Sequence, residues 1–305
     1  MRHATAPLWL FALLCLLWGS NWLVLKLALA SAPPFAFAAA RSIVAGAIMA
    51  AIAGPREVVA LLRAAPGRVV ATALLTNTLT YAGLYWGTAH ISTGLAAIVN
   101  NALMPLGLFA FGLALGEETF SRRRVAGIVL GALGLALLFA RRSGASVDAA
   151  GIAAVAAGTL AYCLGSVGSR PLLRQAAPMT AGGAQMLVGG IALAPLAALE
   201  GDPSGALASL AAPVAFAGLL WMAVAGGVVG ATIYLRLLRD WGPTRSGMCA
   251  FVAPLVATAL GAFVLGERLG AMEAAGGAMM LAAAGLVLPA GRRAPSAVPQ
   301  QDASR

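Results

Sequence analysis

Ten apolar runs, separated by charged or Pro/Gly-rich segments, divide almost the whole sequence. They cover residues 8–30, 35–53, 69–89, 93–115, 125–140, 150–168, 178–198, 213–235, 246–265 and 272–290. One helical crossing of a bilayer needs about 20 apolar residues. The fifth run is short, so tilt or a loop-embedded end must supply its remaining length. The pattern predicts an all-α integral membrane protein with ten transmembrane helices.

Composition excludes the other broad classes of protein. Of the 305 residues, 61% are apolar and only 10% are charged. Soluble domains are typically about 45–50% apolar and about 25% charged, and disordered chains are poor in large apolar residues. The first run exceeds the core of a cleaved signal peptide, which is about 7–15 residues long. We therefore expect a retained first helix.

The net charge of +10 would suggest a nucleic-acid partner in a soluble protein, but basic residues of membrane proteins gather in cytoplasmic loops. With a cytoplasmic N-terminus, 15 of the 20 Lys and Arg residues fall in cytoplasmic segments and three fall outside. The other two, Lys26 and Arg41, lie within predicted spans. This asymmetry predicts both termini in the cytoplasm, ten crossings and no nucleic-acid partner.

The two halves of the sequence resemble each other. Pro105 precedes Leu-Gly-Glu at 115–117 and a Gly-rich run, and Pro254 precedes Leu-Gly-Glu at 265–267 and a second Gly-rich run. Five crossings per half would place the second half upside down in the membrane. Inverted repeats of this kind are typical of transporters that bind their substrate at the repeat interface.

A second correspondence lies earlier in each half. Arg41 follows Pro34 by seven residues, and Gln185 follows Pro178 by seven. The sequence thus predicts a five-helix repeat over 8–140, a second over 149–290, and a cytoplasmic tail over 291–305.

Three sets of residues carry a family resemblance: the run from Leu17 to Trp22 with Lys26, the Pro33–Pro34 pair with Arg41, and the two Pro…Leu-Gly-Glu segments. In these the chain resembles the ten-helix EamA-type permeases of the drug/metabolite transporter superfamily. The resemblance covers about residues 8–290. It implies transport of small polar metabolites, often outward from the bacterial cytoplasm, in the inner membrane.

Polar residues inside membrane spans are expensive and usually face a cavity or another helix. Two stripes at i, i+4 spacing, one in the first run and one in the third, could enclose a small amphipathic solute. Interfacial anchoring and helix–helix hydrogen bonding are the alternative roles. The candidate substrate-binding residues are Trp18, Asn21, Trp22, Lys26, Arg41, Asn77, Tyr81, Tyr85, Asn100, Asn101 and Gln185.

Lys26 and Arg41 have no obvious acidic partner at depth, because every acidic residue falls in a loop or at a span end. Either they attract a substrate carboxylate or phosphate, which Arg can bind with two hydrogen bonds, or they reach out to the membrane interface. The absence of an embedded acid disfavours export of cationic drugs, so an anionic or zwitterionic metabolite fits better.

Pro105 and Pro254 occupy equivalent mid-span positions, where a proline removes a backbone hydrogen bond and can kink a helix. We expect them to gate the cavity or to set helix packing. Glu117 and Glu267 are expected to pair with nearby arginines or to cap helices. The three isolated cysteines and two histidines match no metal or disulfide spacing, so neither a metal nor a cofactor is expected.

Together these patterns predict a non-enzymatic permease that moves an amino acid or similar metabolite by alternating access, with export favoured over import. A flippase of a lipid-linked sugar and a non-transporting assembly subunit remain alternatives. No nucleophile–base pair or acidic dyad at depth indicates an intramembrane enzyme. The expected partners are a small-molecule substrate and the lipid bilayer, and a homodimer is left open.

Overall fold

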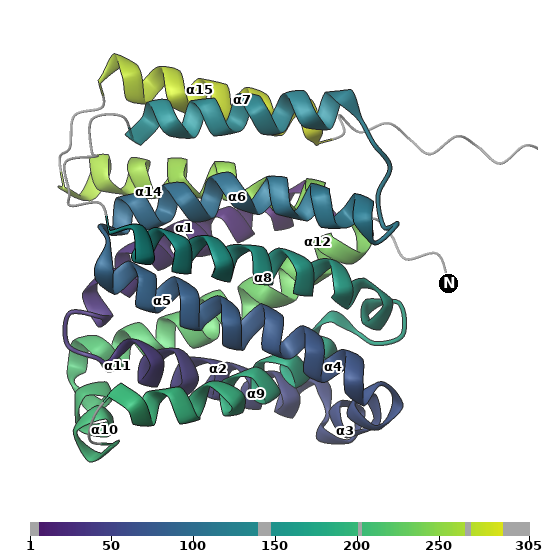
Figure 1. The fold of residues 1–305 in the computed structure, drawn as a ribbon, viewed down its shortest axis with the longest axis vertical. Coiled ribbons are helices and arrows are strands. Elements are labelled where there is room, and N and C mark those ends of the chain that lie inside the picture. Colours follow the sequence, from purple (N-terminus) through teal and green to yellow (C-terminus); the bar gives the residue numbers. More distant parts are fainter. Residues whose placement is uncertain (1–5, 140–147, 201–202, 266–269, 289–305) are drawn as a thin grey trace, which may run out of the picture.

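The computed structural model describes residues 6–139, 148–200, 203–265 and 270–288, and these residues form helices and short connections. Most helices lie lengthwise across Figure 1, side by side in a bundle. The first half contains α1 Leu8–Ala28, α2 Pro34–Ala53, α3 Pro55–Ala64, α4 Pro66–Ala73, η1 Leu74–Leu79, α5 Thr80–His90, α6 Thr93–Ala114 and α7 Arg122–Phe139.

The second half contains α8 Ala149–Leu173, α9 Pro178–Ala197, η2 Ala198–Glu200, α10 Pro203–Ala211, α11 Pro213–Trp221, η3 Met222–Ala231, α12 Thr232–Trp241, α13 Pro243–Gly247, α14 Cys249–Leu265 and α15 Ala271–Val287. Within the described ranges, all ten apolar runs of the sequence are helical, although their bounds differ. The third run, for example, begins at Pro66 rather than at 69, and the sixth continues to Leu173 rather than to 168.

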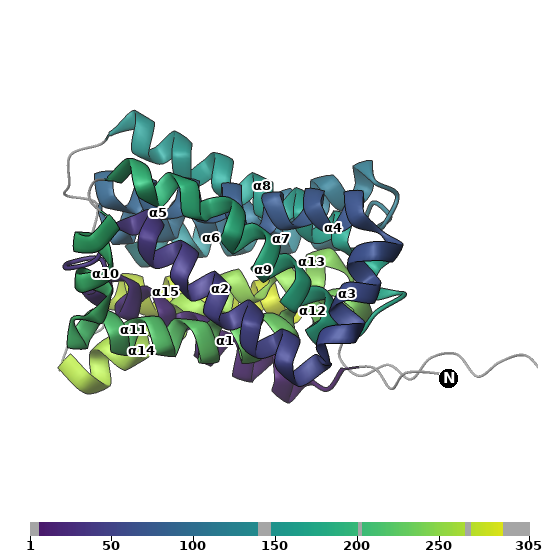
Figure 2. The same ribbon diagram turned by 90° about the horizontal axis from the view of Figure 1, so that it is seen from below.

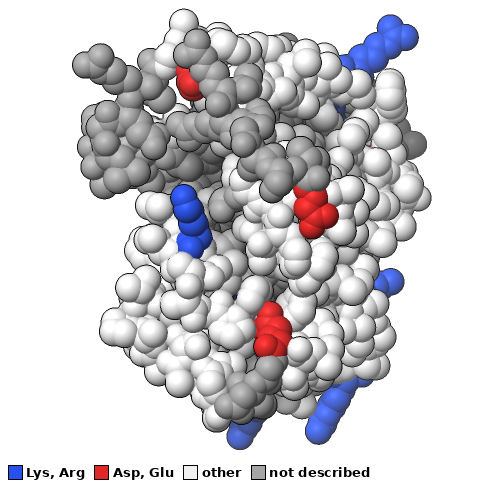
Figure 3. All heavy atoms as spheres, turned by 60° about the vertical axis from the view of Figure 1, so that its left-hand side comes forward, with Lys and Arg blue, Asp and Glu red and all other residues white. Residues whose placement is uncertain are grey.

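Six of the described helices are long and apolar enough to cross a membrane, which makes the chain an integral membrane protein. They are Leu8–Ala28, Pro34–Ala53, Gly94–Ala114, Ala149–Leu173, Pro178–Glu200 and Pro213–Trp241. A seventh crossing is added if Pro55–Ala64 and Pro66–His90, which meet at a bend of 104°, count as one span. Figure 3 brings the left-hand helix ends of Figure 1 forward and shows only scattered charged side chains on this face.

Proline and glycine set the ends of many helices. Proline occupies the first position of α2, α3, α4, α9 and α11, where its missing N–H costs no hydrogen bond. Gly54 and Gly116 take φ angles of 98° and 68°, a region that glycine enters without steric cost. The chain therefore turns sharply from α2 into α3 and after α6.

The helices pair in a pattern that relates the two halves. α2 packs on α9, and α7 packs on α15; Figure 1 shows these pairs at opposite edges of the bundle. Between them, α1 contacts α14, while α6 contacts α8. The short helices α3 and α10, which follow α2 and α9, lie at opposite ends of the molecule (Figures 1 and 2).

Two segments of π-helix interrupt corresponding helices. η1 lies between α4 and α5, and η3 lies between α11 and α12. Such segments widen the helix and often occur at functional sites. Pro105 and Pro254 lie inside the continuous helices α6 and α14.

Candidate solute-binding cavity

A cavity with a volume of about 170 Å³ lies between the two halves. It has room for several water molecules, because a single one needs roughly 10–15 Å³. Side chains from α1, α2, α5, α6, α8, α9, α12 and α14 and from both π-helical segments line it. Ten of the eleven candidate substrate-binding residues line the cavity: Trp18, Asn21, Trp22, Arg41, Asn77, Tyr81, Tyr85, Asn100, Asn101 and Gln185.

Arg41 is the cation of this cavity and is only 4% exposed. Its Nη1 donates to the Tyr85 hydroxyl at 3.0 Å and its Nη2 donates to the Tyr81 hydroxyl at 2.8 Å. The guanidinium carbon also lies 4.3 Å from the centre of the Tyr81 ring, a cation–π contact. Its Nε is buried without a hydrogen-bond partner. The guanidinium is thus held in place but keeps donor capacity.

Within the described part of the chain, no carboxylate forms an ion pair with Arg41. The ion pairs found there involve Glu117, Glu118 and Asp240, all at helix ends or in connections. A buried charge without a counter-charge is costly. An anionic group entering the cavity would therefore be attracted to Arg41.

An aromatic cluster of Trp18, Tyr162 and Tyr234 forms another wall. The Trp18 ring centre lies 5.1 Å from that of Tyr234 and 6.4 Å from that of Tyr162, and the two tyrosine rings are 5.5 Å apart. The Trp18 Nε1 donates to the carbonyl of Gly226 at 3.4 Å. This wall offers ring faces to an apolar part of a solute.

The asparagines form short hydrogen-bonded chains. Thr159 lies 3.0 Å from the Asn100 Oδ1, and the Asn100 Nδ2 donates to the Asn101 Oδ1 at 3.3 Å. The Asn101 Nδ2 is buried without a partner. Asn77 donates to the Thr76 hydroxyl and to the main-chain carbonyl of Gln185. These amides give the cavity polar groups that can orient a solute.

Lys26 is the candidate that the structure leaves outside this cavity. Its side chain is exposed, and it is not among the residues that line the space. Pro105 and Pro254 also stay outside the lining, although the residues just before them, Met104 and Ala253, belong to it. Glu267 lies outside the described residues.

Sequence reasoning missed Tyr162 and Tyr234, together with the methionines Met104, Met186 and Met222. Tyr162 could have been found, because it is a polar aromatic residue in the middle of an apolar run. The methionines gave no signal, since methionine is an ordinary residue of apolar helices. They supply flexible walls that adapt to different shapes.

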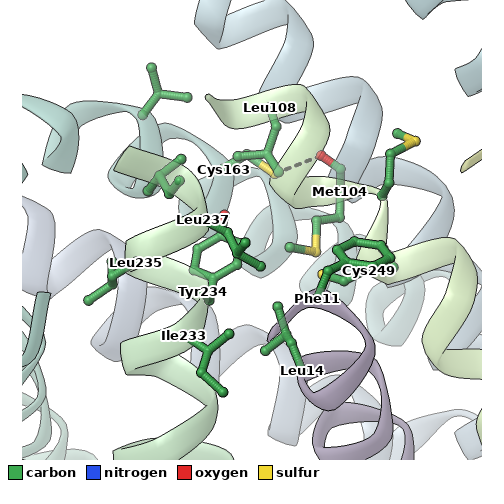
Figure 4. Packing of buried hydrophobic residues seen from close by; sticks show 14 of the residues in the cluster. Phe11, Leu14, Met104, Leu108, Cys163, Ile233, Tyr234, Leu235, Leu237 and Cys249 are labelled. Atoms are coloured by element: carbon green, nitrogen blue, oxygen red, sulfur yellow. Dashed lines mark hydrogen bonds between the residues drawn. The ribbon is translucent and has the colours of Figure 1, made fainter. Parts of the chain in front are cut away.

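The three cysteines are packed inside the bundle, and Cys249 also belongs to the cavity lining. Cys15, Cys163 and Cys249 are free and buried, and Figure 4 shows Cys163 and Cys249 among the apolar side chains around Tyr234. The Cys163 thiol donates to the carbonyl of Met104 at 3.4 Å. No group of His, Cys, Asp or Glu in the described chain could hold a metal ion.

The family model "EamA-like transporter family" matches this chain twice, at residues 5–140 and 149–288. The chain belongs to this family. It is a membrane transporter of small molecules rather than an enzyme, and its resemblance to the drug/metabolite transporters is confirmed.

Similar proteins are found in several bacteria. "Uncharacterized inner membrane transporter YedA" of Escherichia coli is 30% identical over 87% of this chain and 84% of its own length. "Uncharacterized transporter YvbV" of Bacillus subtilis is 28% identical over 85% and 84%. "Probable amino-acid metabolite efflux pump" of Salmonella typhimurium is 27% identical over 88% and 90%.

A crystal structure of another protein has the same fold. It superposes with a TM-score of 0.74 over 91% of this chain and 94% of its own, at 21% identity. At this identity the similarity shows the fold alone.

Proposed function

We propose that this transporter carries small organic solutes with an acidic group, such as amino acids or related metabolites, by alternating access. The observation that carries the proposal is Arg41, a buried guanidinium in the cavity wall without an acidic partner among the described residues. Arg binds carboxylates with two parallel hydrogen bonds. The asparagines and the aromatic wall would orient the rest of the solute.

We further propose ten crossings arranged as two inverted halves, residues 8–140 and 149–290. The double match of the family model supports this division. So do the paired π-helical segments and the position of α3 and α10 at opposite ends of the molecule. The shorter helices α7, α14 and α15 would complete the ten, with local bilayer thinning or tilt adjusting for their length.

The proposed orientation follows from the positive-inside rule. We define the Arg-rich end as residues 54–68, 115–124, 170–178 and 236–248. Eleven arginines lie in these segments, and we assign this end to the cytoplasm of a bacterial inner membrane. Both termini, including the tail 291–305, would then be cytoplasmic.

In the proposed cycle, the described state is closed at the Arg-rich end. Glu117 of the first half accepts hydrogen bonds from Arg170 at 2.7 Å and from Arg174 at 2.6 Å, both in the second half. Glu118 also accepts from the main-chain N–H of Thr244 at 2.9 Å. These contacts join the two halves and would have to break before the cavity opens to the cytoplasm. Bends at Pro105 and Pro254 are the proposed gating points.

We propose export as the direction, in line with the resemblance and with the efflux pump named among the relatives. The test is counterflow in proteoliposomes loaded with mixed amino acids and small organic acids and read by mass spectrometry. Acidic or zwitterionic solutes should exchange with the wild type. Arg41→Ala should abolish exchange without unfolding the protein, and Arg41→Lys should restore little of it.

Arg68→Ala is the matched control, because Arg68 is the same residue type but exposed at the Arg-rich end. It should exchange solutes as the wild type does. Normal exchange by Arg41→Ala, or wild-type exchange restricted to solutes without an acidic group, would overturn the proposal.

A further inference from the structure

Gln185 occupies the position in the second half that Arg41 occupies in the first, since each lies seven residues after the proline that begins its helix. Both line the cavity, and Gln185 is 3% exposed. Their chemistry differs, because a guanidinium can only donate hydrogen bonds, whereas an amide can donate or accept. What Gln185 offers the solute depends on which way its amide points.

Two hydroxyl groups fix that orientation. The Gln185 Nε2 donates to the Thr72 hydroxyl oxygen at 2.8 Å and to the Ser169 hydroxyl oxygen at 2.7 Å. The Thr72 hydroxyl donates its hydrogen to the carbonyl of Arg68 at 2.8 Å, and the Ser169 hydroxyl donates to that of Gly165 at 2.7 Å. With its hydrogen committed to the main chain, each hydroxyl can only accept from Gln185.

The Gln185 amide therefore turns its NH₂ group toward these hydroxyls, and its Oε1 is left for the cavity. We infer that the Gln185 Oε1 is held in a fixed orientation and accepts a hydrogen bond from a donor group on the transported solute. This inference rests on the proposed function, because it concerns the same cavity and adds a specificity-determining group to it.

The spacing of the two positions sets the kind of solute. α2 and α9 are in close register, because a Cβ at Gly46 would lie 2.6 Å from the nitrogen of Leu187 and one at Gly190 would lie 3.0 Å from the nitrogen of Ile43. In that register Gln185 is level with Ile48, seven residues from Arg41. Seven helical residues span about 10 Å.

A solute that reaches both groups must carry its donor several bonds away from its acidic group. The favoured class is thus an acid with a remote hydroxyl, amine or amide N–H, rather than an acid with an apolar tail. A site built around a hydrogen-bonding group rejects analogues that lack that group, because its own polar atom is then left unpaired.

The test compares norleucine with 6-hydroxynorleucine, which differ by one terminal hydroxyl. Both affinities are measured by calorimetry on the full-length protein in lipid nanodiscs. For the wild type we expect the hydroxylated solute to bind about tenfold more tightly, the ratio that one hydrogen bond of about 1.4 kcal/mol produces. Gln185→Met, which keeps the length of the side chain and removes the amide, should bring the ratio to about one.

The double variant Thr72→Val with Ser169→Ala is the second measurement. It retains the amide but frees its orientation, so the ratio should fall to between those of the wild type and Gln185→Met. Met179→Leu, in the same helix but outside the cavity lining, is the control and should keep the wild-type ratio. An unchanged ratio in Gln185→Met or, should that variant not fold, in the double variant would overturn the inference.

The outcomes also separate this inference from the proposed function. Equal binding of both solutes to the wild type would reject the role of Gln185 and leave the acid-binding site in place. Failure of both solutes and of a panel of short organic acids to bind the folded wild type would reject the proposed function, and the inference with it.

Discussion

The helices that follow α3 and α10 show how differently the two halves contribute to the cavity. The segment Pro66–His90 brings Asn77, Tyr81 and Tyr85 to the cavity wall, and its tyrosines hold Arg41. The segment Pro213–Trp241 has the same α–π–α construction, yet it contributes Gly226 and Ala231 together with Met222 and Tyr234. One half supplies most of the polar groups, and the other supplies much of the surface against which they are placed.

Two glycines of the second segment leave room for side chains of α1. A Cβ at Gly226 would lie 2.6 Å from the Asn21 Nδ2, and one at Gly230 would lie 2.8 Å from the Trp18 Nε1. Real contacts are not that short, so the side chains of Asn21 and Trp18 would have to move. Two related halves can thus differ at a shared cavity in the side chains that they lack as well as in those that they carry.

The largest effect is expected from placing side chains where this surface needs glycine. Gly230→Val should displace Trp18, destabilise the protein by about 1–3 kcal/mol and abolish exchange. Exchange is read by counterflow, and stability by thermal unfolding in detergent. Gly67→Val is the control, because a Cβ at Gly67 would meet no atom within 4 Å. Wild-type behaviour of Gly230→Val would break the distinction between the two segments.

The next effect concerns the polar segment. Tyr85→Phe removes the hydroxyl that accepts from the Arg41 Nη1 and leaves the ring in place. Hydrogen bonds to charged groups contribute about 1.5–3 kcal/mol. Without this bond Arg41 should leave its position, and the affinity for an acidic solute should fall about 10- to 100-fold. Calorimetry measures the affinity. An unchanged affinity would show that the guanidinium is held by other contacts.

A smaller effect is expected at the Arg-rich end. Glu117→Gln weakens the contacts with Arg170 and Arg174, which should raise the population of protein open at this end. Because Arg174 is largely exposed, its share of the effect is limited by solvent. We expect a change of a few-fold in exchange rate, with labelling of a cysteine introduced at Ser166 as the readout of opening. Lower labelling than in the parent would contradict the proposed closure.

The smallest effect is expected at Lys26, which is exposed and outside the cavity lining. Lys26→Ala should change the affinity for acidic solutes by less than about twofold, since exposed charges are well screened. Competition binding measures it beside Arg41→Ala. A loss of affinity comparable to that of Arg41→Ala would contradict this expectation and place Lys26 in the binding site as a second cation.

The sequence was sufficient for much of the fold because hydropathy acts locally along the chain. The apolar runs became helices, and the cost of burying polar groups marked Arg41, Asn77 and Asn101, which line the cavity. The division into two five-helix repeats stays a prediction.

Other features depend on contacts between distant segments. The i, i+4 spacing placed Lys26 on one stripe with Trp18 and Trp22, but only the packing of α1 against its neighbours determines where the cavity ends along that stripe. The orientation of the Gln185 amide likewise depends on Thr72, which is distant in the sequence. Tyr234 lies close to Trp18 although more than two hundred residues separate them.

The most direct test of the central claim is whether Arg41 recognises an acidic group. The affinities of a short organic acid that binds the wild type and of its carboxamide are compared in the wild type and in Arg41→Ala. The account predicts that the wild type prefers the acid by about 100-fold, or about 2.7 kcal/mol, and that Arg41→Ala loses this preference while remaining folded. Equal preference for the acid in both proteins would contradict it.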